Sequence, residues 1–396
     1  MSYSFADFID RRGTDSAKWD GRKDKVGRDD ILPLWVADAD WNTAPVISAA
    51  IQDRAEHKIY GYTKPGPEHD QAVVGWLSRR YGWQIRPEWI TYTSGIVPAL
   101  HLAVQLLSEK GEAVVLQSPV YRPFFQAIAE NGRVLLNNQL LFDGSSYRID
   151  FADLEAKLAR EETRLMILCS PHNPVGRVWT EEELSRMGEL CLANDVVIIS
   201  DEIHADLTFS GHRHIPLASL SEELAARTIT LYSPSKTFNV AGLYASAAVI
   251  PHQGMREEFI KKAHGMIASV SLFGLTAIKA AYSAGDSWLD AQLDYLQVSM
   301  EYTLDFVERN IPGVKVHQPD GTYLLWLDFR DILPDPDSLE EFLLEEARVG
   351  LVNGSWFGPG GAGFMRLNMA CPRETLQEAL ERIARAVKRE KKSPAG

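Results

Sequence analysis

The stretch "YSPSKTFN", residues 232–239, decides the fold of this 396-residue chain. It overlaps the end of an apolar run, "TITLY", and its single lysine, Lys236, lies between small hydroxylated residues and an aromatic. A lysine just past a buried strand is either an ordinary surface cation or a nucleophile held at the strand end. The residues that follow the neighbouring strands decide between these two interpretations.

Short apolar runs alternate with amphipathic stretches through the middle of the chain. Such alternation predicts an α/β fold with a mostly parallel sheet that is covered by helices on both faces. Ligands of such sheets bind at the carboxyl ends of the strands, so any chemistry is expected just after these runs. The expected strands are "WITYTS" (89–94), "AVVLQ" (113–117), "RVLLNN" (133–138), "LMILCS" (165–170), "VVIIS" (196–200), "TITLY" (228–232) and "ASAAVI" (245–250).

The chain is too long for one hydrophobic core, which predicts two domains. We expect a large domain over 46–290, a smaller α+β domain over 291–396, and an N-terminal segment, 1–45, that packs with the smaller domain. Thr43 is the expected cap of the first long helix. Helical periodicity predicts helices over 44–57, 67–81, 293–310, 338–347 and 373–389.

Composition excludes several function classes. The net charge of −13 disfavours nucleic acids and anionic membranes as partners, because both require a positive field. The three cysteines form no C-x-x-C pair and no zinc-type cluster, so no metal site is predicted, and a reducing compartment is favoured. No signal-like or membrane-spanning apolar segment is present, so we expect a cytoplasmic location and no membrane partner.

Three polar or aromatic features follow the first expected strands. Gly95 and Ile96 begin a helix whose backbone N–H groups favour an anion. Tyr121 could stack on a planar ligand, and the amide of Asn173 could bond to a ligand oxygen. Each feature also has an ordinary interpretation, as a helix start, a gap-filling side chain or a turn residue.

The last two strand ends carry charges. Asp201 lies at the end of an apolar strand, where a carboxylate is costly to bury unless a cation pairs with it. His204 is either part of the same site or a hydrogen-bonded core histidine. Lys236, if desolvated, becomes a nucleophile toward carbonyl groups. An anion cradle, a stacking face, an amide, a carboxylate and a lysine together fit one ligand, pyridoxal 5′-phosphate.

Nine motifs, in order along nearly the whole chain, resemble the MalY/PatB branch of cystathionine β-lyases, or C–S lyases, within the fold-type-I pyridoxal-phosphate superfamily of aspartate aminotransferase. The resemblance implies a large domain with a mostly parallel seven-stranded sheet between helices and a smaller α+β domain. The motifs are "LPLWVADADW" (32–41), "IYGYT" (59–63), "SGIVPAL" (94–100), "SPVYRPF" (118–124), "HNPVGRVW" (172–179), "DEIHADL" (201–207), "SPSKTFNVAGL" (233–243), "GTYLLWLDF" (321–329) and "GFMRLNMACPR" (363–373).

The resemblance also implies roles for single residues. Lys236 would bind the cofactor covalently and move the α-proton of the substrate, and Asp201 would pair with the ring nitrogen. Asn173 would contact the ring oxygen. Tyr121, which would stack on the ring, completes the expected catalytic set with Lys236 and Asp201. The remaining expected cofactor contacts are Gly95, Ile96 and Ser233 at the phosphate, His204 near the ring, and Tyr62 from the partner subunit of a homodimer.

The substrate side is implied in the same way. Arg366 would clamp the substrate carboxylate, and the backbone near Ala37 would close on it. Tyr60 is an alternative to Tyr62 for the contact across the dimer. Side-chain selectivity is expected around Trp41, Tyr121, Arg122 and Trp356.

Two positions depart from the wider superfamily. His204 stands where aminotransferases often carry a tyrosine, and Tyr244 stands where they often carry an arginine. Both resemble the lyase branch. The expected activity is therefore α,β-elimination at L-cysteine S-conjugates, a class of small amino-acid substrates. The alternatives are an aminotransferase and a regulatory or binding protein on an inherited scaffold.

Overall fold

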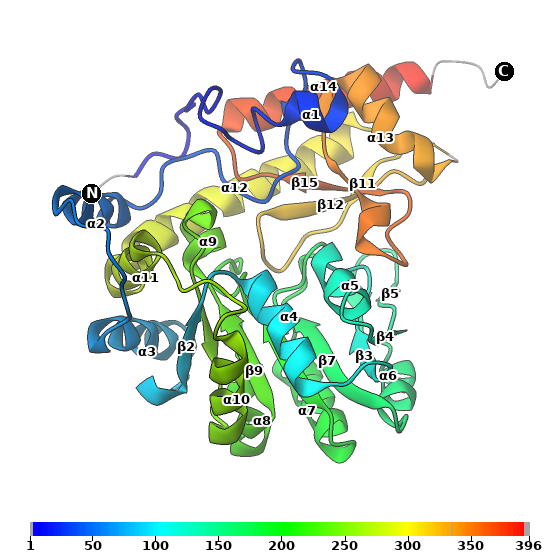
Figure 1. The fold of residues 1–396 in the computed structure, drawn as a ribbon. Coiled ribbons are helices and arrows are strands. Elements are labelled where there is room, and N and C mark those ends of the chain that lie inside the picture. Colours follow the sequence, from blue (N-terminus) through cyan, green and yellow to red (C-terminus); the bar gives the residue numbers. More distant parts are fainter. Residues whose placement is uncertain (1–2, 334, 392–396) are drawn as a thin grey trace.

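A computed structural model describes residues 3–333 and 335–391 (Figure 1). Its large sheet has seven strands, and β10 alone runs in the direction opposite to the other six. The predicted mostly parallel sheet is therefore confirmed. In spatial order the strands are β2 (Ile90–Thr93), β10 (Ser246–Val249), β9 (Thr228–Tyr232), β8 (Val197–Asp201), β7 (Thr163–Cys169), β3 (Ala113–Leu116) and β4 (Val134–Asn137).

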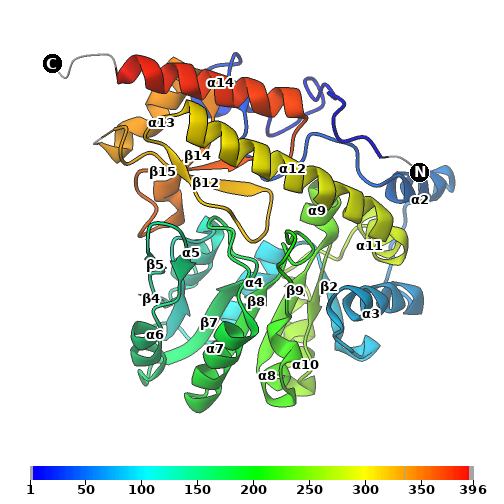
Figure 2. The same cartoon turned by 180° about the vertical axis from the view of Figure 1, so that it is seen from behind.

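Helices cover both faces of this sheet (Figures 1 and 2). Alternate residues of a strand point to opposite faces, and in β3 this places Val114 and Leu116 in one apolar cluster and Ala113 and Val115 in another. The first cluster includes side chains of α4 (Ile96–Leu107), α5 (Arg122–Ala129) and α10 (Gln253–Ala263). The second includes side chains of α6 (Phe151–Leu158), α7 (Glu181–Ala193) and α8 (Glu222–Ala226).

Three further helices pack together, with α11 (Leu272–Ala284) in contact with both α2 (Pro45–Glu56) and α3 (Pro67–Tyr81). The predictions for α2 and α3 are confirmed, but the expected cap of α2 is wrong. Ala44 is the N-cap because Pro45, with its fixed φ, occupies the first helical position. Thr43 stands one residue too early, and its buried hydroxyl has no hydrogen-bond partner within the described part of the chain.

A second layer lies over the carboxyl ends of the large sheet. Its four antiparallel strands are, in spatial order, β11 (Lys315–Val316), β12 (Leu324–Asp328), β15 (Phe364–Asn368) and β14 (Val352–Asn353). Two long helices, α12 (Asp286–Asn310) and α14 (Arg373–Glu390), run along this sheet (Figure 2). The helix expected over 293–310 begins earlier, at Asp286, because Trp288 and Leu289 are buried and extend its apolar face.

The N-terminal segment joins this second layer. Its strand β1 (Leu32–Pro33) pairs in parallel with β13 (Val349–Gly350), which follows α13 (Leu339–Phe342) and a π-helical turn over Leu343–Ala347. The domain limits at 45/46 and 290/291 stay a prediction. Other short elements are α1 (Arg22–Val26), α9 (Pro234–Thr237), and the paired strands β5 (Leu141–Phe142) and β6 (Tyr147–Arg148). Among the described residues, no helix combines the length and apolarity needed to cross a bilayer.

Candidate active site

A cavity of about 240 Å³ opens at the carboxyl ends of the large sheet. It forms where the loops that follow β2, β3, β7, β8 and β9 converge, as expected for an open α/β sheet. Nine predicted site residues line it: Ala37, Gly95, Ile96, Tyr121, Asn173, Asp201, His204, Ser233 and Lys236.

Lys236 is held on α9, a single helical turn that follows β9. Ser233 caps this turn, because its hydroxyl oxygen accepts a hydrogen bond from the Ser235 N–H at 3.1 Å. The hydroxyl of Thr237 anchors the other side, donating to the buried carboxylate of Asp206 at 2.7 Å. Desolvation, together with the positive charge of Arg366, lowers the pKa of Lys236 to about 8. Lys236 is therefore suited to act as a nucleophile and a base.

The amine of Lys236 meets the backbone of the N-terminal segment. Its Nζ donates a hydrogen bond of 2.8 Å to the carbonyl oxygen of Ala37. Ala37 belongs to the 34–41 segment, which passes over the cavity between the two layers. A residue 199 positions earlier in the chain thus completes the surroundings of the lysine.

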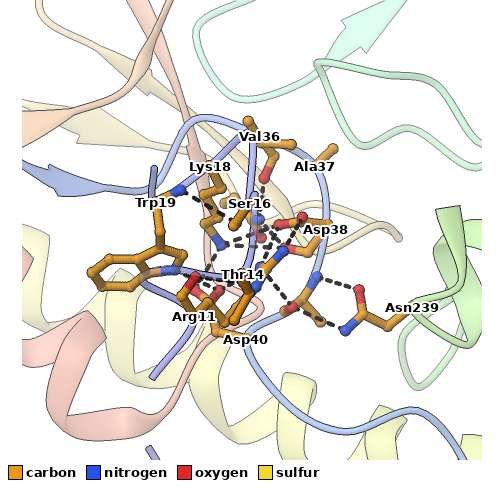
Figure 3. A network of polar contacts seen from close by, with 12 residues as sticks. Arg11, Thr14, Ser16, Lys18, Trp19, Val36, Ala37, Asp38, Asp40 and Asn239 are labelled. Carbon is orange, nitrogen blue, oxygen red and sulfur yellow. Dashed lines mark hydrogen bonds and ion pairs between the residues drawn. The ribbon is translucent and has the colours of Figure 1, made fainter. Parts of the chain in front are cut away.

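A partly buried charge network fixes this segment (Figure 3). The fully buried Lys18 bonds to Asp40 at 2.7 Å, and Arg11 bridges Asp40 and Asp38. The side chain of Asn239 holds Ala39 through two further hydrogen bonds. It accepts one from the Ala39 N–H at 3.0 Å and donates one to the Ala39 carbonyl oxygen at 3.0 Å. Because every member is paired, the network can hold the segment rigidly.

Asp201 is a buried carboxylate at the end of β8. Among the described residues, its carboxylate accepts one hydrogen bond, from the Ile203 N–H at 3.1 Å. Burial, reinforced by the neighbouring Glu202, raises the pKa of Asp201 to about 7. Such a carboxylate needs a cationic partner, and the protonated ring nitrogen of pyridoxal phosphate fits that need.

Arg366 lies on β15 of the second layer, and it does not line the cavity itself but contacts Asn173, which does. Its guanidinium donates to the Asn173 side-chain oxygen at 3.1 Å and to the Trp35 carbonyl at 2.9 Å. Burial lowers the pKa of Arg366 to about 10. Its Nε and the Nδ1 of His204 are buried and have no hydrogen-bond partner among the described residues. Since buried polar atoms are normally paired, these orphaned nitrogens point to a polar ligand.

The start of α4 forms one side of the cavity, the side where the sequence predicts phosphate binding. Gly95 has a φ of +131°, a backbone conformation that favours glycine, and its N–H bonds to the Ser246 hydroxyl at 3.1 Å. The N–H groups of Ile96 and Val97 open the helix, where no preceding turn can accept them. Tyr121 stays protonated, because burial and the charge of Asp201 raise its pKa.

Tyr62 is not brought into this cavity. Its side chain is fully exposed, and the neighbouring Tyr60 is also exposed and donates to the Ala55 carbonyl at 2.8 Å. Neither tyrosine touches the cavity from its own chain. The role of Tyr62 therefore stays a prediction that concerns a second subunit.

The expected selectivity residues divide into two groups. The guanidinium of Arg122 lies 5.3 Å from the ring of Trp356, so these two form one surface. Trp41 is buried in the core, and its indole donates to Gln292 at 3.3 Å. Trp41 also lines a second cavity, of about 310 Å³, which lies beside the first and shares Ala241 with it.

Several residues at the site were not expected from the sequence. Cys169 lines the cavity while remaining buried. Ser94 and Ser235 line it as well, and their positions beside predicted contacts could have suggested this. Tyr323 approaches the site from the second layer, where its hydroxyl donates to the Ala37 carbonyl oxygen. No local pattern in "GTYLLWLDF" indicates this contact.

Comparison with protein families decides the identity of the fold. The model described as "Aminotransferase class I and II" matches residues 32–383. The chain belongs to this family. The family depends on pyridoxal 5′-phosphate, so the predicted cofactor and the predicted fold type are confirmed.

Within the family, the chain is similar to proteins named as lyases. It is 45% identical to cystathionine beta-lyase PatB of Bacillus subtilis (strain 168), over 96% of this chain and 98% of that relative. It is 34% identical to protein MalY of Escherichia coli (strain K12), over 98% and 99% of the two chains. The predicted resemblance to the MalY/PatB branch is confirmed.

Solved structures of other family members have the same fold. Cystalysin from Treponema denticola, which contains pyridoxal 5′-phosphate, superposes with a TM-score of 0.95 and 36% identity, covering 98% of this chain and 100% of that chain. A pyridoxal-phosphate-bound C–S lyase from Staphylococcus hominis superposes with a TM-score of 0.91 and 34% identity, covering 98% of both chains.

Proposed function

We propose that this protein is a pyridoxal-phosphate-dependent carbon–sulfur lyase. It would cleave L-cysteine S-conjugates by α,β-elimination, consuming water and releasing a thiol, pyruvate and ammonia. With cystathionine as the conjugate, the thiol is homocysteine. The observation that carries this proposal is the 45% identity, over 96% of the chain, to a protein named cystathionine beta-lyase.

The lining residues fit the cofactor. Asp201 would hold a proton at the ring nitrogen, and Tyr121 would stack on the ring. Because the Asn173 side-chain oxygen already accepts a bond from Arg366, its amide nitrogen remains as the donor for the ring oxygen. The helix start at Gly95 and Ile96, with Ser233, would hold the phosphate, and His204 would lie near the ring. When bound, pyridoxal phosphate supplies a ring system that takes up the electrons of the broken α-carbon bond.

The reaction itself is assigned to Lys236 and Arg366. Arg366, with the backbone at Ala37, would bind the substrate carboxylate and so orient the α-carbon toward the lysine. The neutral amine of Lys236 removes the α-proton, and its lowered pKa increases the neutral fraction near pH 7. The ammonium group that results then returns a proton to the departing sulfur.

The active unit is proposed to be a homodimer. Ile59, Tyr60 and Tyr62 form an exposed apolar run, which is the kind of surface that a second subunit covers. Tyr62 would reach the phosphate bound by the partner subunit. We also propose a cytoplasmic location, which the three buried free cysteines support, since reduced thiols persist there.

A product assay separates this function from its alternatives. The purified protein, loaded with pyridoxal phosphate, is offered a panel of L-cysteine S-conjugates with and without added keto acids. Thiol and pyruvate should appear in equal amounts without a keto acid. A strict need for a keto acid would establish an aminotransferase instead, the activity after which the family is described. No turnover in either condition would favour a binding or regulatory protein.

A further inference from the structure

Two side chains from different layers donate to one carbonyl oxygen. Lys236, on α9 after β9, lies 2.8 Å from the Ala37 oxygen, and the hydroxyl of Tyr323 lies 3.0 Å from the same atom. Tyr323 directly precedes β12 in the second layer. The Ala37 carbonyl therefore connects the N-terminal segment to both the large sheet and the second layer.

The surroundings of Tyr323 keep its hydroxyl protonated, so that it remains a hydrogen-bond donor to the Ala37 carbonyl oxygen. Its side chain is buried, and its ring lies edge-on to His204 with the centroids 6.2 Å apart. Burial, with the nearby charge of Asp38, raises the pKa of Tyr323 above its usual range. The hydroxyl thus keeps its proton throughout the pH range in which an enzyme of this kind works.

The shared oxygen determines where the amine of Lys236 points. A carbonyl oxygen has two lone pairs, so both donors can be held together. When a neutral amine donates one N–H to this oxygen, its own lone pair is directed away from it. A fixed carbonyl therefore fixes the direction from which Lys236 can accept a proton.

The same backbone also reaches the residue proposed to bind the substrate carboxylate. Arg366 donates to the Trp35 carbonyl at 2.9 Å, and Asn368 donates to the carbonyls of Val36 and Asp38 at 2.6 and 2.7 Å. The 34–41 segment thus connects carboxylate binding to the position of the base. Tyr323 contacts the segment at the atom that touches Lys236.

We propose that Tyr323 is a positioning residue for proton transfer, because its hydroxyl holds the Ala37 carbonyl that aims the free amine of Lys236 into the cavity. The proposal rests on the proposed role of Lys236 as the base. The other charged and titratable groups around Lys236 are Asp201 and His204 on the β8 side, Arg366 on β15, Asp38 on the N-terminal segment, and Tyr121, Cys169 and Tyr244, which line the same cavity.

The test uses Tyr323→Phe, which removes the hydroxyl and keeps the ring. Its matched control is Tyr147→Phe, another buried tyrosine, whose hydroxyl accepts a bond of 3.0 Å from Trp326 away from the cavity. In the cofactor-free full chain, an acylating reagent modifies Lys236 when its amine is neutral, and mass spectrometry reports the extent at each pH. In the holoenzyme, kcat and KM are measured with an S-conjugate.

Loss of the hydroxyl leaves the Ala37 oxygen entirely to Lys236, which favours the ammonium form. The midpoint of Lys236 modification should therefore rise by about half a pH unit, as expected for one neutral hydrogen bond. The kcat value should fall about fivefold with little change in KM. The Tyr147→Phe control should change neither quantity.

Other outcomes overturn the proposal. An unchanged or lowered modification midpoint in Tyr323→Phe means that the hydroxyl does not act through Lys236, even if kcat falls. An equal effect in Tyr147→Phe means that both variants act only by loosening the core. The modification assay does not depend on the reaction catalysed, so failure of the lyase assay and failure of this proposal are distinguishable.

Discussion

Arg366 donates a hydrogen bond of 3.1 Å to the side-chain oxygen of Asn173, joining β15 of the second layer to the loop that follows β7. Each of these residues is assigned to a different ligand, the substrate carboxylate and the cofactor ring. Their contact gives the two binding functions a common geometry. A change in the position of either side chain should therefore affect the binding of both ligands.

Replacing Lys236 with Ala should abolish turnover, reducing kcat by roughly 10³-fold or more, because the variant loses both the covalent attachment and the base. The visible absorbance of the holoenzyme that depends on this attachment should also disappear. Both are measured by absorption spectroscopy and a thiol-release assay, with circular dichroism as the control for folding. Persistent turnover would refute the mechanism.

Replacing Arg366 with Lys should raise KM for an S-conjugate by about 10- to 100-fold, because an ammonium group cannot bind a carboxylate bidentately. The matched control is a substrate analogue without the α-carboxylate, for which wild type and variant should differ little. Steady-state kinetics with both compounds test this. If KM for the carboxylate substrate did not change, the assigned clamp would be wrong.

Asp201 should make the cofactor-free chain less stable as the pH rises. Its pKa of about 7 lies above the usual value of 3.8, so the folded chain binds the proton more tightly than the unfolded chain. The unfolding free energy should therefore fall between about pH 4 and pH 7, by up to about 4 kcal/mol.

Asp201→Asn is the variant that tests this pH dependence. It should raise Tm at pH 8 but change it little at pH 4, since the native carboxyl is then already neutral. Thermal unfolding at both pH values provides the measurement. The same variant should bind pyridoxal phosphate more weakly, because the ring nitrogen loses its anionic partner. A Tm difference between variant and wild type that is the same at pH 4 and pH 8 would contradict the assigned burial cost.

Mixed dimers should reveal whether Tyr62 acts across the interface. Lys236→Ala and Tyr62→Ala homodimers should each be impaired. In a heterodimer of the two, the site with an intact Lys236 receives an intact Tyr62 from its partner, so mixing the subunits should restore activity. Tyr60→Ala in place of Tyr62→Ala serves as the control for the neighbouring tyrosine. Absence of restoration, with heterodimers shown by mass spectrometry, would place the Tyr62 contact within one chain or exclude it.

The sequence predicted the large sheet and most of the cavity for one physical reason. The carboxyl ends of parallel strands lie at the same edge of a sheet. The chain order alone therefore predicted that Asn173, Asp201 and Lys236 lie close together. Helix limits were predicted less well. Pro45 displaced the expected cap at Thr43, and buried residues near Trp288 extended α12 beyond its expected start.

Contacts between distant segments could not be predicted from local patterns. Tyr323 and Ala37 are separated by 286 positions, and Lys18 and Asp40 become partners only when the N-terminal segment folds back on itself. Such pairs depend on how the layers dock. Neither the hydrophobic periodicity nor the turn residues of either segment predict how the layers pack together.

The Ala37 carbonyl has a consequence for how variation in this protein is interpreted. Every amino acid at position 37 would supply the same oxygen, so an alanine or deep mutational scan tests the side chain there and leaves the functional atom in place. Position 37 could therefore score as tolerant of substitution although its carbonyl oxygen contacts the amine of Lys236. An amide-to-ester replacement that weakens this carbonyl as an acceptor, introduced at the bond between Ala37 and Asp38, would expose the dependence directly.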